Sequence, residues 1–284
     1  MTAFGTSNEP IGDLEPEPLE LASWEMTLGE LVLEELPSLG ADALVRGLDS
    51  PSLRLLAGQT HYDSPLDSRD LFVTALGEMG IEELQEADAA WRLIRLTASR
   101  IVAGTIDPLT GSEYIWRRSL SVEPNGDLRI FAGISSALDD DGADQRLLAR
   151  EAAAAAKEFL ERASPRRWLR LRADVAREPL EWTDTNRQSH PEVNPSALEI
   201  SPDLAREVEA WNADFGSTMS GWPKEGGFAS TRAAEAFVEA GRVLVSRLQE
   251  ELGEAFVVEY LPEAIRPPGL KKRPLVKRLR RMRR

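Results

Sequence analysis

The stretch Ile81–Gly104, IEELQEADAAWRLIRLTASRIVAG, predicts a long amphipathic helix at the centre of a helical domain. Its apolar residues recur at steps of three and four, which places their side chains on one stripe of an α-helix. The stripe consists of Leu84, Ala87, Trp91, Ile94, Ala98 and Ile101, and Leu93 and Val102 widen it. Gly104 is a suitable end point because glycine readily adopts positive φ, and Asp107-Pro108 disfavours continuation. The stretch carries no catalytic motif, so it indicates a fold and not a chemistry.

The length and composition are those of an ordinary globular protein. The chain has 284 residues, 42% of them hydrophobic, which suggests about two domains. It contains no run long and apolar enough for a transmembrane helix, and its N-terminus lacks the basic and apolar regions of a secretory signal. The absence of cysteine excludes disulfides, thiolate metal sites and cysteine nucleophiles. We therefore expect a cytoplasmic protein.

The net charge of −14 conceals an uneven distribution. Residues 266–284 hold ten basic residues and no acidic one, so the remaining 265 residues hold 24 basic and 48 acidic residues. An acidic body with a basic tail is the clearest electrostatic feature of the chain.

The first part of the chain predicts helices almost throughout. Residues 1–18 are rich in proline and glutamate and are expected to be a disordered leader. Between 19 and 164, helices are expected up to Pro37, over 38–46, and from Pro51, Pro65, Pro108 and a cap at Asp141 or Asp144. Residues 128–134 fit either a strand or a helix start. We expect an all-α helical bundle.

The character of the sequence changes near Pro165, and residues 165–265 predict a smaller α+β domain. RWLRLRA (167–173) alternates as a strand does, and FVVEY (256–260) and residues 197–200 are further strand candidates. Helices are expected after Ser201 and Ser230, with Gly241 on a buried face where another element approaches closely. The fold class is therefore mainly α, a helical bundle followed by a small α+β domain.

Few residues suggest chemistry. The two histidines, His61 and His190, lie in polar loops and outside any known catalytic frame. The acidic run Asp139–Asp144 fails the calcium-loop pattern, which requires glycine at its sixth position and glutamate at its twelfth. We expect a non-enzymatic protein without metal or cofactor.

Two tryptophans are candidate partner-binding residues. Trp182 and Trp222 lie in segments that predict polar, proline-rich loops. An aromatic side chain in such a loop can anchor a partner, or it can cover the core of its own domain.

The tail has a pattern of its own, with Leu275, Leu279 and Met282 at helical spacing between basic residues. It can bind an anionic lipid or nucleic-acid surface, dock on an acidic protein surface, or remain solvated. The residues that would contact an anionic surface are Lys271, Lys272, Arg273, Lys277, Arg278, Arg280, Arg281, Arg283 and Arg284.

Two groups of segments resemble known kinds of bacterial protein. The first resembles a helical domain of uncharacterised actinomycete-type proteins and comprises Gly47–Gly58, Leu71–Ile81, Ile101–Gly111 and Ile115-Trp116. The second is similar to small α+β domains found among bacterial toxin-immunity proteins and other uncharacterised proteins. It comprises Leu198–Phe215, Gly227–Ser230, Ala240–Gly253 and Val257–Glu263. The matched residues are turns, caps and core positions, so the resemblance implies a fold and assigns no functional residue.

Three functions remain open from the sequence. The first is a protein-interaction module, an immunity-type inhibitor that binds a basic partner such as a nuclease toxin through its acidic body. The second is a binder of membranes or nucleic acid through the basic tail. The third is an enzyme whose carboxylates come together only in the fold.

Overall fold

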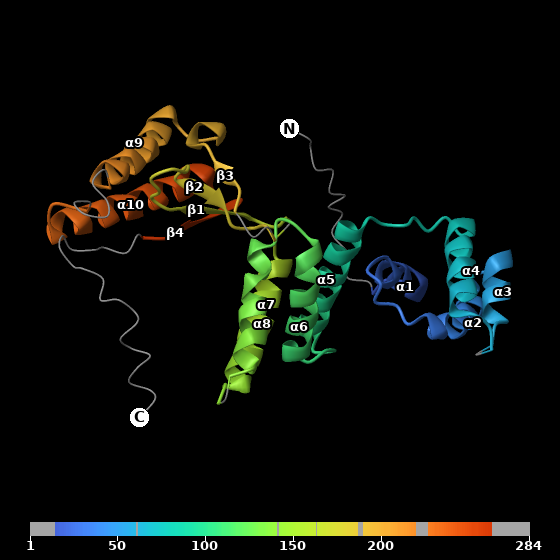
Figure 1. Ribbon diagram of the computed structural model, residues 1–284. Coiled ribbons are helices and arrows are strands. Elements are labelled where there is room, and N and C mark those ends of the chain that lie inside the picture. The colour runs from blue at the N-terminus through green and yellow to red at the C-terminus, as the bar shows by residue number, and fades with distance from the viewer. Residues whose placement is uncertain are drawn as a thin grey trace, which may run out of the picture. The chain divides into compact units, whose positions relative to one another are not determined.

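The chain folds into two compact units, divided between Pro165 and Arg166 (Figure 1). The computed structural model describes residues 15–60, 62–140, 142–162, 164–186, 190–219 and 227–262. Within these ranges there are ten α-helices and one four-stranded sheet, and the sheet lies in the C-terminal unit. The predicted class, mainly α with a small α+β part, is confirmed.

The N-terminal unit begins with four helices around one apolar core. They are α1 (Pro18–Thr27), α2 (Leu36–Val45), preceded by the 3-10 turn η1 (Leu33–Glu35), α3 (Pro51–Ala57) and α4 (Pro65–Glu78). Leu36, Leu53 and Phe72 are fully buried in this core. The predicted helix ending before Pro37 is wrong, because Pro37 lies in the first turn of α2, where a missing N–H leaves no hydrogen bond unmade.

The second part of this unit is built around the central helix. It consists of α5 (Glu86–Ala103), α6 (Pro108–Arg118), η2 (Ser119–Ser121), η3 (Gly126–Leu128), α7 (Arg129–Leu138) and α8 (Gln145–Leu160). Gly104 ends α5 with φ 73°, as predicted. Residues 128–134 belong to a 3-10 turn and the start of α7, and α8 is capped by Asp144.

The α5 helix buries more of its surface than the predicted stripe. Ile94, Ala98 and Ile101 face the core shared with α6, α7 and α8. A second face, which includes Leu93, packs against Trp24 of α1. Leu93 is buried as predicted, whereas Val102 is 49% exposed. Burial also extends to Leu96, because neighbouring helices cover α5 from two sides.

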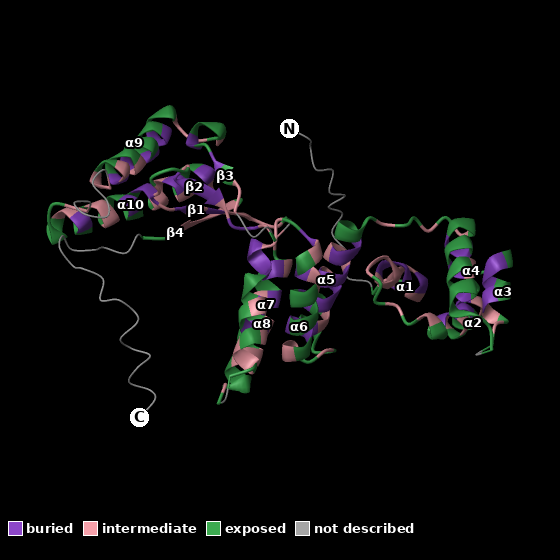
Figure 2. Ribbon diagram, viewed as in Figure 1, coloured by how far each residue is buried: buried purple, intermediate pink, exposed green. Residues whose placement is uncertain are grey.

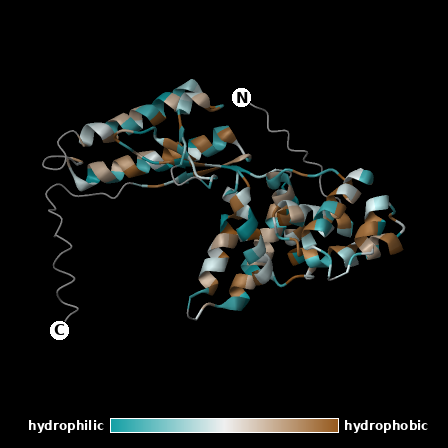
Figure 3. Cartoon of the chain, turned by 45° about the vertical axis from the view of Figure 1, so that its right-hand side comes forward, coloured by the Kyte–Doolittle hydropathy of each residue, from teal (hydrophilic) through white to brown (hydrophobic). Residues whose placement is uncertain are grey.

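The C-terminal unit is a mixed sheet with two helices on one face. The strands β1 (Arg167–Leu171), β2 (Leu180–Trp182), β3 (Glu192–Val193) and β4 (Phe256–Tyr260) lie in the order β3-β2-β1-β4. β1 is antiparallel to β2 and parallel to β4. The helices α9 (Pro202–Thr218) and α10 (Thr231–Leu252) bury their apolar sides against the sheet (Figures 2 and 3).

Two expectations for this unit are corrected. Trp182 ends strand β2 and does not lie in a loop. Residues 197–200 do not form a strand, because Ala197 ends a 3-10 turn, η4 (Pro195–Ala197), and the residues after it pair with no strand among the described residues. A strand depends on its pairing partners, which a short segment of sequence does not reveal.

Gly241 lies where the predicted close approach occurs. It is buried in α10, and a Cβ atom added there would lie 2.5–2.8 Å from atoms of the Tyr260 side chain. The absent side chain thus lets β4 pack directly on α10.

Several predictions concern residues outside the described ranges. These are His61, Trp222, residues 1–14 of the leader and the basic tail, 266–284. Of the helices that are described, none is long and apolar enough to cross a membrane. Across the same residues, no group of three or more His, Cys, Asp or Glu side chains is placed to hold a metal ion.

Candidate functional site

The face of the sheet turned away from α9 and α10 carries a line of charged residues. In β1, Leu169 and Leu171 point into the helix-covered core, so Arg170 points to the opposite face. The strand register places Glu181 of β2 and Glu259 of β4 on either side of Arg170. We call these three residues, together with Glu192 of β3, which pairs with Glu181, the charged row.

Arg170 joins the middle of the charged row. Its Nη1 lies 3.3 Å from Glu181 Oε1, and its Nη2 lies 3.2 Å from Glu259 Oε2. The side chains of Arg170, Glu181 and Glu259 are only 20%, 9% and 28% exposed. Partial burial strengthens the attraction between opposite charges and also raises the cost of separating them. The three side chains are therefore held in a fixed arrangement.

The β3 end of the row brings two like charges together. Glu181 and Glu192 are directly paired across β2 and β3, an arrangement that is unfavourable for two carboxylates. Arg177 offsets it, because its Nε donates to Glu192 Oε1 at 2.6 Å, and this hydrogen bond lowers the pKa of the Glu192 carboxyl. With Arg177 counted, this surface has three carboxylates and two guanidinium groups, so one negative charge is in excess, which favours a partner with cationic groups.

The predicted site residue Trp182 lies on the other, helix-covered face of the sheet. Its ring stacks on Phe256 with 6.2 Å between centroids, and the Arg167 guanidinium lies 4.0 Å above it. Arg167 Nε also donates to the fully buried Asp184 at 2.7 Å. The half-buried Trp182 thus helps to cover the core of its own domain. Its partner-binding role stays a prediction, and the other candidate, Trp222, is outside the described ranges.

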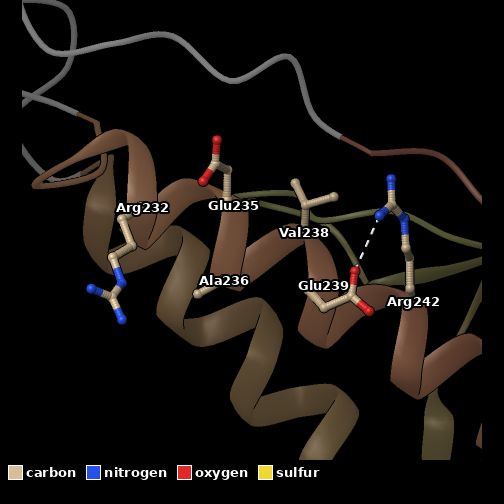
Figure 4. Close-up of a pocket in the computed structure, with 6 residues that line it drawn as sticks. All are labelled: Arg232, Glu235, Ala236, Val238, Glu239 and Arg242. Carbon is tan, nitrogen blue, oxygen red and sulfur yellow. Dashed lines mark hydrogen bonds and ion pairs between the residues drawn. The ribbon is translucent and has the colours of Figure 1, made fainter.

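A second charged surface lies on the outward side of α10 (Figure 4). It is a shallow depression formed by residues of that helix alone, Arg232, Glu235, Ala236, Val238, Glu239 and Arg242. Glu239 and Arg242 pair at 3.1 Å, but both side chains are 64% exposed. Ordering such mobile, solvated side chains on binding costs conformational entropy. The charged row is the better candidate because three of its four side chains, those of Arg170, Glu181 and Glu259, are partly buried and joined by ion pairs.

Sequence reasoning did not identify the charged row. The alternation in RWLRLRA does turn Arg170 away from the core. FVVEY has two adjacent valines and does not alternate in this way, and the register with β1 places Glu259 on the face of Arg170. The sequence does not show that Arg170 and Glu259 lie side by side, because they are 89 positions apart in the chain. β2, which supplies Glu181, is only three residues long and was not predicted.

This geometry defines a small α+β module, with helices on one face of a mixed sheet and fixed charges across the other. Residues 167–263, roughly a third of the chain, match the family model described as Serratia CdiI immunity protein-like. No curated protein matches the chain. The resemblance of this region to toxin-immunity proteins is confirmed, and it indicates an immunity-type, protein-binding role. The resemblance of the helical domain to actinomycete-type proteins stays a prediction.

Proposed function

We propose that the C-terminal unit binds a protein toxin and neutralises it, and that the charged row is the centre of the contact. The observation that carries this proposal is the similarity of residues 167–263 to an immunity family. The charged row supports the choice of surface because its partly buried ion pairs reduce the entropy lost on binding.

The proposed partner is basic. Three of the four residues of the charged row are acidic, and the chain outside the tail carries twice as many acidic as basic residues, 48 against 24. Opposite charges accelerate encounter and select against acidic partners. The encounter is proposed to occur in the cytoplasm.

The first test is capture from native lysate with the full-length chain and a 1–265 truncation in parallel. A basic protein retained by both forms, which arrests growth when expressed alone and is harmless when co-expressed with the truncation, is the expected result. A captured protein whose toxicity is unaffected by the truncation would contradict the proposal.

The same experiment tests the alternative function of the tail. If nucleic acid or anionic vesicles bind the full-length chain and not the truncation, the basic residues of 266–284 are the binding element. Such binding should weaken steeply with salt.

A further inference from the structure

Among the described residues β4 is an edge strand of the sheet, and half of its backbone groups point away from β1. Arg167 N–H donates to Ala255 C=O, and Leu261 N–H donates to Leu171 C=O. The backbone groups of residues 255, 257, 259 and 261 therefore form the hydrogen bonds to β1. Those of Phe256 and Val258 are directed to the outer side of the strand. A row of outward N–H and C=O groups is a template for another strand.

One side chain occupies this outer edge. Gln249 of α10 accepts the Val258 N–H through Oε1 at 3.0 Å and donates through Nε2 to Phe256 C=O at 3.0 Å. The same Nε2 donates to Gly253 C=O at 2.9 Å. The side-chain amide thus makes the two hydrogen bonds that the N–H and C=O of one residue in an adjacent parallel strand would make.

The opposite edge is blocked by other means. β3 has only two residues, and Pro191 and Pro195 flank it closely. Proline cannot donate a backbone hydrogen bond, and very short strands make poor templates. Gln249 is therefore the distinctive protection of the longer edge.

We infer that Gln249 prevents β4 from pairing with β4 of a second copy of this chain. The segment FVVEY is composed mainly of β-branched and aromatic residues, which favour strand pairing. Antiparallel pairing of two copies about Val258 would place its outward N–H and C=O groups opposite each other, so the exposed edge would be complementary to itself.

The test compares Gln249→Ala with Glu250→Ala, which makes the same substitution at an exposed neighbouring position. Gln249→Ala is expected to raise amide exchange at Val258 by about tenfold in dilute solution and to shift the mass, measured by light scattering, toward that of a dimer at high concentration. Glu250→Ala is expected to behave as the wild type. If both variants match the wild type in exchange and mass, the inference is wrong.

Two further measurements do not depend on the stability of the alanine variant. In the wild type, the Val258 amide should be protected from exchange although it lies at a sheet edge, and rapid exchange there would overturn the inference. Gln249→Glu keeps the acceptor but loses both donors and adds a negative charge to the edge. It should remain at the wild-type mass, and dimerisation of this variant would also count against the inference.

Discussion

Arg170 is the residue on which the candidate site depends, because it is the one guanidinium between the carboxylates of Glu181 and Glu259. The ion pairs of Arg170 fix the geometry of the row and add little to the net stability of the fold, because desolvation of partly buried charges offsets their attraction. Removing Arg170 would leave Glu181, which is 9% exposed, without its ion-pair partner in the row. For this reason the carboxylates at the ends of the row are better targets for mutation than its centre.

Gly241 gives the clearest stability prediction for a single residue. Gly241→Ala should destabilise the protein by about 1–3 kcal/mol, because the new methyl group would overlap the Tyr260 ring. Gly216→Ala is the matched control, since a Cβ at that position in α9 meets nothing within 4 Å. The control should be neutral or stabilising by up to about 1 kcal/mol. Urea unfolding of both variants measures the difference, and equal stabilities would show that β4 does not pack tightly on α10.

Among the elements, α3 has an N-terminus held by a residue from the neighbouring helix. Glu78 of α4 accepts from the backbone N–H and the hydroxyl of Ser52, each at 2.9 Å. The carboxylate also faces the positive end of the α3 helix dipole. Hydrogen bonds from Ser50 and Ser52 lower the pKa of the Glu78 carboxyl below its ordinary value of 4.5.

This contact predicts a pH dependence with a defined sign. A carboxyl whose pKa is lowered by folding contributes stability above its unfolded-state pKa and loses it as the pH falls through the folded-state value. Between pH 6 and pH 3 the wild type should therefore lose more stability than Glu78→Gln. Glu82→Gln, which removes an exposed carboxylate a few residues later, should follow the wild type. Parallel pH curves for the wild type and Glu78→Gln would refute the role of Glu78.

Elements with local signals were predictable from the sequence. Ser50-Pro51 and Ser201-Pro202 mark helix starts because cap and proline act within one turn, and both side chains do cap their helices. The strand at Leu180–Trp182 was not predicted, because three residues are too few to show an alternating pattern. It is defined by its pairing with β1, which the local sequence does not reveal. The charged row was beyond prediction for the same reason: its residues belong to four strands whose register is set by the whole domain.

At the scale of the whole molecule, the overall charge and the charge of the candidate site have the same sign. The body of the chain carries a large acidic excess, and the region similar to immunity proteins presents three carboxylates on one sheet face. The proposed basic toxin would be attracted by the negative charge of the whole body and would then contact the carboxylates of the charged row.

The decisive measurement is a calorimetric titration of the captured toxin with three forms of the full-length protein. These are the wild type, Glu192→Gln/Glu259→Gln in the charged row, and Glu235→Gln/Glu250→Gln on the outward side of α10, with folding of each checked by thermal unfolding. Both variants remove two negative charges. The first also breaks the ion pairs of Glu192 with Arg177 and of Glu259 with Arg170, so the check on folding shows whether a loss of affinity belongs to the surface. We predict that the first variant weakens binding at least about tenfold, or ~1.4 kcal/mol, while the second binds nearly as the wild type does. Equal affinities for the two variants would contradict the assignment of the charged row as the binding surface.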